Sequence, residues 1–359
     1  MKKDSYGPGN DRSRFGPGSV LNPVGLMSGD AAKSAISCGL ASSLAGGRVA
    51  FTHCEILETG DSGEIHRRLS PVNDVGTGLS CLNGARGPFA GHCLSQPLVM
   101  GVVNVTPDSF SDGNEHMDAA KAIAWAADLI QAGAEILDIG GESTRPGAVP
   151  VGVQEECDRI LPVVEATAAA GITVSVDTRH AETMRAAIAA GATIINDITA
   201  FTYDRAALRT VAETGASVIL MHMQGKPESM QDNPCYGLAS IDIYHWLKAR
   251  IDACLEYGMS RDRIAIDPGI GFGKADKHNM EILNRMGMFH GLGCAVAVGV
   301  SRKSFIGRIA DVETPKERLP GTLAATAIAL SRGVQIHRVH DVAEIRQALS
   351  VWEAQYDNG

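Results

Sequence analysis

Polar side chains follow almost every short apolar run in the second part of this 359-residue chain, and their types suit ligand binding. The set comprises Asn104, Asp177, Asn196, Asp267, Ser301, Lys303, Arg338 and His340. A carboxylate can accept two N–H bonds in one plane, so the acids, with an amide and a lysine, suit a flat nitrogen heterocycle with an amidine-like edge. The cations and Asn104 suit an anionic group, such as phosphate with a metal ion. Together they suggest group transfer with loss of phosphate or diphosphate.

Side-chain alternation along the last two apolar runs predicts that their cations converge. Neighbouring residues of a strand point to opposite sides, so Ser301 and Lys303 share one side and Arg302 takes the other. By the same rule, Arg338 and His340 lie together. We therefore expect the cations of the two runs to meet at one mouth of the fold.

Two alternatives to this convergence remain open. Arg338 could instead form a surface ion pair with Asp341 or Asp311. His337 and His340 have a spacing that binds metal ions on a helix, but on a strand the parity is wrong for a two-histidine metal site.

Two further motifs carry weaker signals. The run 269–274 (GIGFGK) looks like a phosphate loop, but Pro268 and Ala275 replace the glycine and the Ser or Thr that such a loop requires. Three methionines could line a flat-ring pocket, although methionine fills gaps in protein cores at least as often. They are Met221, Met223 and Met230, of which Met221 ends a predicted strand.

Short apolar runs alternate with helical stretches from residue 98 onward, and this repeat must position the polar residues. The predicted strands are 98–105, 136–139, 172–176, 193–198, 217–221, 264–266, 295–300 and 334–339. The predicted helices include 118–131, 154–169, 181–189, 241–257 and 321–330. Eight such units predict a (β/α)8 TIM barrel, in which active sites lie where the strands end. An open doubly wound sheet is the structural alternative.

Residues 1–90 have a different composition, with 15 of the 40 glycines and no sustained strand or helix period. They contain too few large apolar residues for a core of their own. We expect them to be largely disordered, as an authentic appendage or as sequence upstream of the natural start. Residues 91–359 are then the catalytic domain.

The overall composition excludes several classes of protein. The chain has 32 Lys+Arg against 41 Asp+Glu, and this negative balance argues against a nucleic-acid partner. No apolar run approaches the roughly 18 residues of a membrane span, and no secretory signal is evident. The eight cysteines form no Cys-x-x-Cys pair, so they read as reduced thiols. We expect a cytoplasmic protein.

Eight polar motifs, taken in order, resemble those of dihydropteroate synthase, an enzyme of folate biosynthesis. They are 100–113 (MGVVNVTPDSFSDG), 140–147 (GGESTRPG), 176–178 (VDT), 195–197 (IND), 220–223 (LMHM), 267–269 (DPG), 301–304 (SRKS) and 338–341 (RVHD). The first two loops are nearly diagnostic, and the resemblance extends over residues 98 to about 355.

The resemblance implies a (β/α)8 transferase that joins 6-hydroxymethyl-7,8-dihydropterin diphosphate to 4-aminobenzoate and releases diphosphate and dihydropteroate. The residues implied to hold the pterin are Asp177, Asn196, Met221, Asp267, Phe272 and Lys303. Those implied to hold diphosphate are Asn104, Thr144, Arg338 and His340, with Asn104 also binding Mg²⁺. Those implied for aminobenzoate are Phe110, Thr144, Arg145, Pro146 and Ser301.

The implied chemistry fits these residue types. The aryl amine is already neutral at pH 7, so the difficult event is the departure of diphosphate. Mg²⁺, Arg338 and His340 would stabilise the leaving group, and Asp177 would stabilise the ring cation. Lys303 and Arg145 complete the implied catalytic set. Sulfonamides would compete with aminobenzoate, and the family also implies a homodimer formed by the late barrel helices.

The sequence departs from the family pattern at Asn114, where a second glycine is usual, and at Thr199 and Ala200. A methyltetrahydrofolate-dependent methyltransferase module is the nearest rival, but it needs no diphosphate cradle. A catalytically idle pterin-binding scaffold is a second rival, and such a chain should have lost Asn104 or Arg338.

Overall fold

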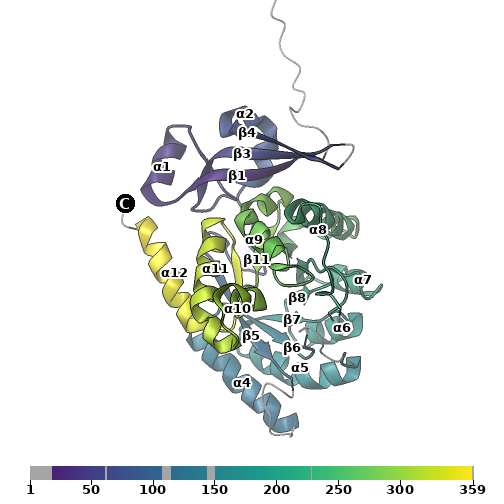
Figure 1. Cartoon of the computed structure of the whole chain (residues 1–359). Helices are drawn as coiled ribbons and strands as arrows, with labels where there is room; N and C mark the ends of the chain where they lie inside the picture. The colour runs from purple at the N-terminus through teal and green to yellow at the C-terminus, as the bar shows by residue number, and fades with distance from the viewer. Residues whose placement is uncertain (1–17, 61–62, 107–114, 144–149, 228, 358–359) are drawn as a thin grey trace, which may run out of the picture.

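A closed parallel barrel occupies the second part of the chain in the computed structural model, which describes residues 18–60, 63–106, 115–143, 150–227 and 229–357 (Figure 1). The strands pair in the order β5-β6-β7-β8-β9-β10-β11-β12, and β12 closes on β5. They are β5 (Leu98–Asn104), β6 (Ile136–Gly140), β7 (Thr173–Asp177), β8 (Ile194–Asp197), β9 (Ser217–Met221), β10 (Ile264–Asp267), β11 (Ala295–Val298) and β12 (Ile336–Val339). The (β/α)8 barrel predicted from the apolar runs is confirmed, and the open sheet is excluded.

Helices surround this barrel, because each helix has an apolar face that it buries by packing against the strands. The α-helices are α4 (Glu115–Gln131), α5 (Val153–Ala169), α6 (Ala181–Ala189), α7 (Ala207–Ala212), α8 (Ala239–Glu256), α9 (Asp276–Asn284), α10 (Ser304–Ala310), α11 (Leu319–Ser331) and α12 (Val342–Asp357). Short 3-10 helices are η3 (Arg261–Arg263), η4 (Met286–Leu292) and η5 (Pro315–Arg318). None of the helices in the described ranges has the length and apolar character that crossing a membrane requires.

Residues before the barrel form an antiparallel sheet, where we expected disorder. Its elements are β1 (Val20–Met27), α1 (Gly29–Ser37), β2 (Ser42–Ser43), β3 (Ala50–Thr59), β4 (Ile65–Pro71), α2 (Val72–Val75), η1 (Gly76–Leu79) and α3 (Ser80–Asn83). Strand β3 is central, with β1 on one side and β2 and β4 on the other. The expectation of disorder is therefore wrong for the described part of residues 1–90, and residues 1–17 lie outside it.

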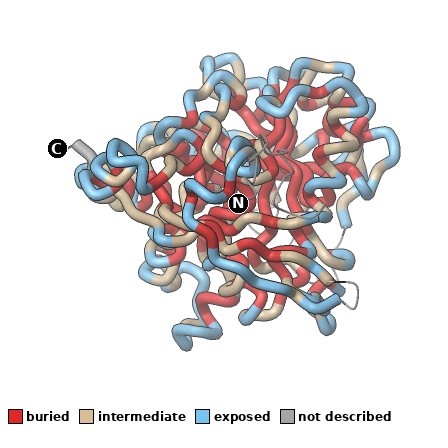
Figure 2. Tube along the Cα trace, turned by 90° about the horizontal axis from the view of Figure 1, so that it is seen from above, coloured by how far each residue is buried: buried red, intermediate tan, exposed pale blue. Residues whose placement is uncertain are grey.

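The barrel completes the core of this N-terminal sheet, which explains why the segment folds with few large apolar residues of its own. Phe51 and Ile56 are buried in a cluster to which Trp352, from the last barrel helix, also belongs. Val20 and Leu57 belong to the core cluster of the barrel itself. Figure 2 shows buried segments running continuously through the middle of the molecule, with exposed segments around them.

The N-terminal sheet packs against the end of the barrel where the strands begin. Strand β1 contacts η4, which precedes β11, and a methyl group on Gly287 of η4 would lie 2.9 Å from Pro23. Arg86, after the sheet, donates hydrogen bonds to the carbonyls of His290 (2.6 Å) and Cys294 (3.1 Å). The opposite end of the barrel, where the strands end, is therefore left clear of this sheet.

Replacing Phe51 with Ala should lower the free energy of unfolding by about 3–5 kcal/mol, because it opens a cavity in the shared core. Leu69→Ala is the matched control, since Leu69 lies in the same sheet with its side chain 63% exposed, and it should change stability by less than about 0.5 kcal/mol. Urea denaturation of the full chain measures both. Equal stability of the two variants would mean that the sheet is not folded onto the barrel.

Candidate active site

Neighbouring strands bring Asn104, Asp177 and Asn196 side by side at the carboxyl end of the barrel. Parallel pairing aligns Asn104 with Gly140, Gly140 with Asp177, and Asp177 with Asn196. A methyl group on Gly140 would lie 3.5 Å from Cβ of Asp177 and 3.9 Å from Oδ1 of Asn104. The strand register thus collects three predicted residues into one site, and glycine leaves room between two of them.

A fourth acid, Asp138, lies one layer deeper and was missed by the sequence analysis. Its side chain is fully buried, two residues before the end of β6. It accepts hydrogen bonds from Ser175 (2.6 Å), Asn196 (3.1 Å) and Arg338 (2.5 Å). The signal that could have found it is a charged residue inside an otherwise apolar run, because a buried acid needs partners.

Arg338 lies between two buried acids. Its Nε atom donates to Asp138, and Nη2 donates to Asp177 at 2.9 Å. Burial alone would lower the pKa of Arg338, but Asp138 and Asp177 raise it above its ordinary value. The alternative of a surface pair with Asp341 is not realised, because Asp341 binds Arg302. Nη1 makes no hydrogen bond within the described ranges and so can reach a ligand.

Burial shifts the pKa values of the ligand-facing groups toward neutral pH. It raises the pKa of Asp177 to about 7, an effect that Arg338 opposes and Asp138 reinforces. It also raises the pKa of Asp267, against the hydrogen bond from the Gly269 N–H and the charges of nearby lysines. The pKa of Lys303 is lowered by burial to about 8, although Asp267 opposes this. A ligand that donates N–H groups to the acids would favour their ionised forms.

Phe272 and Lys303 meet on the neighbouring side of the site. The Nζ atom of Lys303 lies 4.0 Å from the centre of the Phe272 ring, a cation–π contact. Asp267 accepts a 2.7 Å hydrogen bond from the Gly269 N–H, and its strand pairs it with the buried Met221. The fold therefore brings together four of the residues predicted to hold the pterin: Met221, Asp267, Phe272 and Lys303.

Ser301 and His340 are joined by a 3.0 Å hydrogen bond between Oγ and Nδ1. Burial, followed by the charge of Arg338, lowers the pKa of His340 to about 3. His340 is thus neutral here and acts as a hydrogen-bonding group. His337 is buried, with Nε2 donating to the Val334 carbonyl.

Phe110, Thr144, Arg145 and Pro146 lie outside the described residues, as does Asn114.

Of the other departures from the family pattern, Thr199 donates from its N–H and its Oγ to Oδ1 of Asp197, both at 2.7 Å. The next residue, Ala200, has a left-handed backbone with φ of 47°.

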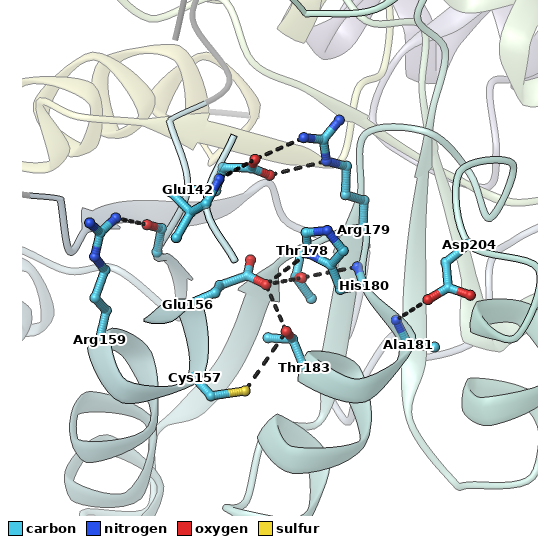
Figure 3. Close-up of polar contacts among 12 residues, drawn as sticks. Glu142, Glu156, Cys157, Arg159, Thr178, Arg179, His180, Ala181, Thr183 and Asp204 are labelled. Atoms are coloured by element: carbon cyan, nitrogen blue, oxygen red, sulfur yellow. Dashed lines mark hydrogen bonds and ion pairs between the residues drawn. The ribbon is translucent and has the colours of Figure 1, made fainter. Parts of the chain in front are cut away.

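A second polar cluster lies beside the site and has the composition of a metal centre (Figure 3). Side-chain oxygen and nitrogen atoms of Glu142, Glu156 and His180 lie within 4.8 Å of one another. Both oxygens of Glu142 already bind Arg179, at 2.8 and 3.1 Å, and Oε2 of Glu156 accepts a bond from Thr183 at 2.7 Å. Because the guanidinium already supplies the positive charge, we interpret the cluster as structural.

The chain matches the family model of pterin-binding enzymes over residues 100–340, and it belongs to that family. The family resemblance stated from the eight motifs is confirmed.

Among its relatives, the dihydropteroate synthase of Escherichia coli K12 is 47% identical over 262 residues, which are 73% of this chain and 92% of that protein. A solved Xanthomonas albilineans dihydropteroate synthase in complex with 7,8-dihydropteroate is 42% identical, with a TM-score of 0.66, over 73% of this chain and 94% of that one. The Yersinia pestis dihydropteroate synthase with a sulfonamide drug is 44% identical, with a TM-score of 0.69 and the same shares.

Proposed function

We propose that this chain catalyses the dihydropteroate synthase reaction, a step of folate biosynthesis, at the carboxyl end of its barrel. The substrates are 6-hydroxymethyl-7,8-dihydropterin diphosphate and 4-aminobenzoate, and the products are 7,8-dihydropteroate and diphosphate. The observation that carries the proposal is the pair of ion pairs that the half-buried Arg338 makes with the buried Asp138 and Asp177, beside Asp267 and Lys303. It combines acceptors for a bicyclic base with a cation for a leaving anion.

The pterin ring would lie among the carboxylates and the cation–π pair. Oδ1 of Asp177 makes no hydrogen bond within the described ranges, and it would accept N–H groups from the amidine-like edge of the ring. Asn196 and Asp267 would supply further acceptors, and Lys303 would donate to a ring oxygen or nitrogen. Met221 and Phe272 would cover the ring faces.

Diphosphate would bind between Asn104, Arg338 and His340. The amide of Asn104 is half-buried and makes no hydrogen bond in the described part of the chain, so its oxygen can serve a hard cation. One protein oxygen fits Mg²⁺, which keeps waters and substrate phosphates as its other ligands. When bound, the ion would neutralise charge on the departing diphosphate.

Each of these side chains would have a separate role in the condensation reaction. The nitrogen lone pair of the amine attacks the pterin methylene carbon, the C–O bond to diphosphate breaks, and the amine proton passes to solvent. Nη1 of Arg338 and the neutral His340 would donate to the developing diphosphate charge. Asp177 would stabilise the positive charge on the ring, and Ser301 would turn its hydroxyl from Nδ1 of His340 to the benzoate carboxylate. Phe110, Thr144, Arg145 and Pro146 remain proposed contributors from the first two loops.

Diphosphate release tests the proposed reaction directly. On mixing both substrates with Mg²⁺ we expect release that depends on 4-aminobenzoate, and Arg338→Ala should reduce turnover on the order of 10²–10³-fold, the size of one lost charge-stabilising donor. Arg209→Ala is the control, because Arg209 is an exposed residue of α7. Release that proceeds equally without the amine would indicate hydrolysis and contradict the proposal, and full activity of Arg338→Ala would contradict the role of that residue.

The pH dependence of kcat/KM for the pterin substrate should be bell-shaped. The ionised carboxylate of Asp177 is the binding form, so the rate falls as pH drops below its pKa of about 7. The charged form of Lys303 is the donor, so the rate also falls as pH rises above its pKa of about 8. A pH–rate profile measures both limbs, and the acid limb should disappear in Asp177→Asn. A flat profile between about pH 6 and 9 would exclude these assignments.

A homodimer through α10 and α11 is the oligomer we expect. Helix α11 is apolar around most of its surface, Ile306 of α10 packs on Gly321 of α11, and Ile309 is 58% exposed beside them. Light scattering should show a dimer for the wild type and mostly monomer for Ile309→Glu, with Leu69→Glu unchanged. A monomeric wild type at micromolar concentration would contradict this expectation.

A further inference from the structure

The segment 269–274, which follows β10, is held in one conformation by its own glycines. Gly269 and Gly273 have φ values of +70° and +61°, which side-chain-bearing residues rarely adopt. A Cβ atom at Gly269 would lie 2.0 Å from the His222 carbonyl oxygen, and one at Gly273 would lie 2.4 Å from the Gln224 carbonyl oxygen. The segment therefore lies directly against the chain that follows β9, and this contact fixes where Phe272 is held.

A fully buried lysine, Lys274, lies beneath this contact. Its Nζ atom bonds Nδ1 of His222 (2.9 Å), the His222 carbonyl (3.2 Å) and the Phe272 carbonyl (2.9 Å). Burial and the charge of Lys274 lower the pKa of His222 to about 2, so its ring is neutral and Nδ1 can accept a bond. The Nζ atom of Lys274 thus has three uncharged hydrogen-bond partners.

A lysine in this place needs a reason beyond packing. Burial lowers the pKa of Lys274, and no carboxylate bonds it in the described part of the chain, although Asp267 lies near enough to favour its charged form. A methionine would fill the same volume without the cost of burying an amine. Two further bonds hold the segment independently: Asn279 accepts from the Gly271 N–H (2.8 Å), and the Tyr236 hydroxyl donates to the Gly273 carbonyl (2.7 Å).

We propose that Lys274 is a positioning residue of the pterin site, acting through the Phe272 and His222 carbonyls that it joins. By fixing these two strand-end segments together, it sets the Phe272 ring against Lys303 and keeps Asp267 facing the ligand. Lys274 itself touches no substrate. The inference rests on the proposed pterin site, and it predicts a selective effect on the pterin substrate.

Steady-state kinetics of Lys274→Met, with the KM of each substrate measured separately, tests this role. We expect the KM for the pterin diphosphate to rise about tenfold or more, the size of one or two lost hydrogen bonds, while the KM for 4-aminobenzoate stays within about twofold. Lys248→Met is the matched control, because Lys248 lies on the surface of α8, and it should leave both values unchanged. Circular dichroism confirms that each variant is folded.

The possible outcomes distinguish the positioning role of Lys274 from the assignment of the pterin site itself. A folded Lys274→Met enzyme with a wild-type pterin KM, or with equal changes in both KM values, would overturn the positioning role. If Lys274→Met does not fold, Lys274→Gln replaces it. In that variant we expect a smaller rise in the KM for the pterin diphosphate and again no change in the KM for 4-aminobenzoate. A wild-type pterin KM in Lys274→Gln would equally overturn the positioning role. Asp267→Asn tests the site separately, since an unchanged pterin KM in that variant would mean that the pterin binds elsewhere.

Discussion

The contact of Arg338 with Asp138 and Asp177 is the interaction on which the rest of the site depends. Two buried carboxylates in one small volume repel each other, and leaving either unpaired would be costly. The guanidinium reaches both because its fork is planar and because, in the closed barrel, only β5 separates its strand, β12, from β6, and only β5 and β6 separate it from β7. An open sheet with β5 and β12 at opposite edges would leave the acids and the cation apart, so closure of the barrel makes the site possible.

The same contact leaves the acids able to serve a ligand. Arg338 opposes the effect of burial on Asp177 without cancelling it, so the pKa of that carboxyl group lies near neutrality. A base that donates N–H groups can therefore ionise Asp177 as it binds, while Asp138 stays bonded to Ser175 and Asn196. The deeper acid holds the cation in place, and the shallower one is free to exchange partners.

The sequence predicted the residues that lie where strands end, because the period of the apolar runs reveals those ends. Asp138 was missed because it lies inside a run, where only its burial and its partners give it a role. His340 was expected to join the cations, and burial, which the sequence does not report, makes it neutral instead. The N-terminal sheet escaped prediction for a related reason: its core includes Trp352, a residue about 300 positions later in the chain.

The two ends of the barrel therefore have different roles: contacts at the end where the strands begin bear on stability, and the end where the strands end holds the proposed site. The N-terminal sheet lies outside the family match and packs where strands begin, so its contacts, such as Pro23 with Gly287, bear on stability. Glu55 of β3 also pairs with Arg285 at the end of α9, and this helix begins directly after the segment that holds Phe272. Because α9 joins the two ends, the sheet can stabilise the helix that supports the pterin side without contributing a residue to the site.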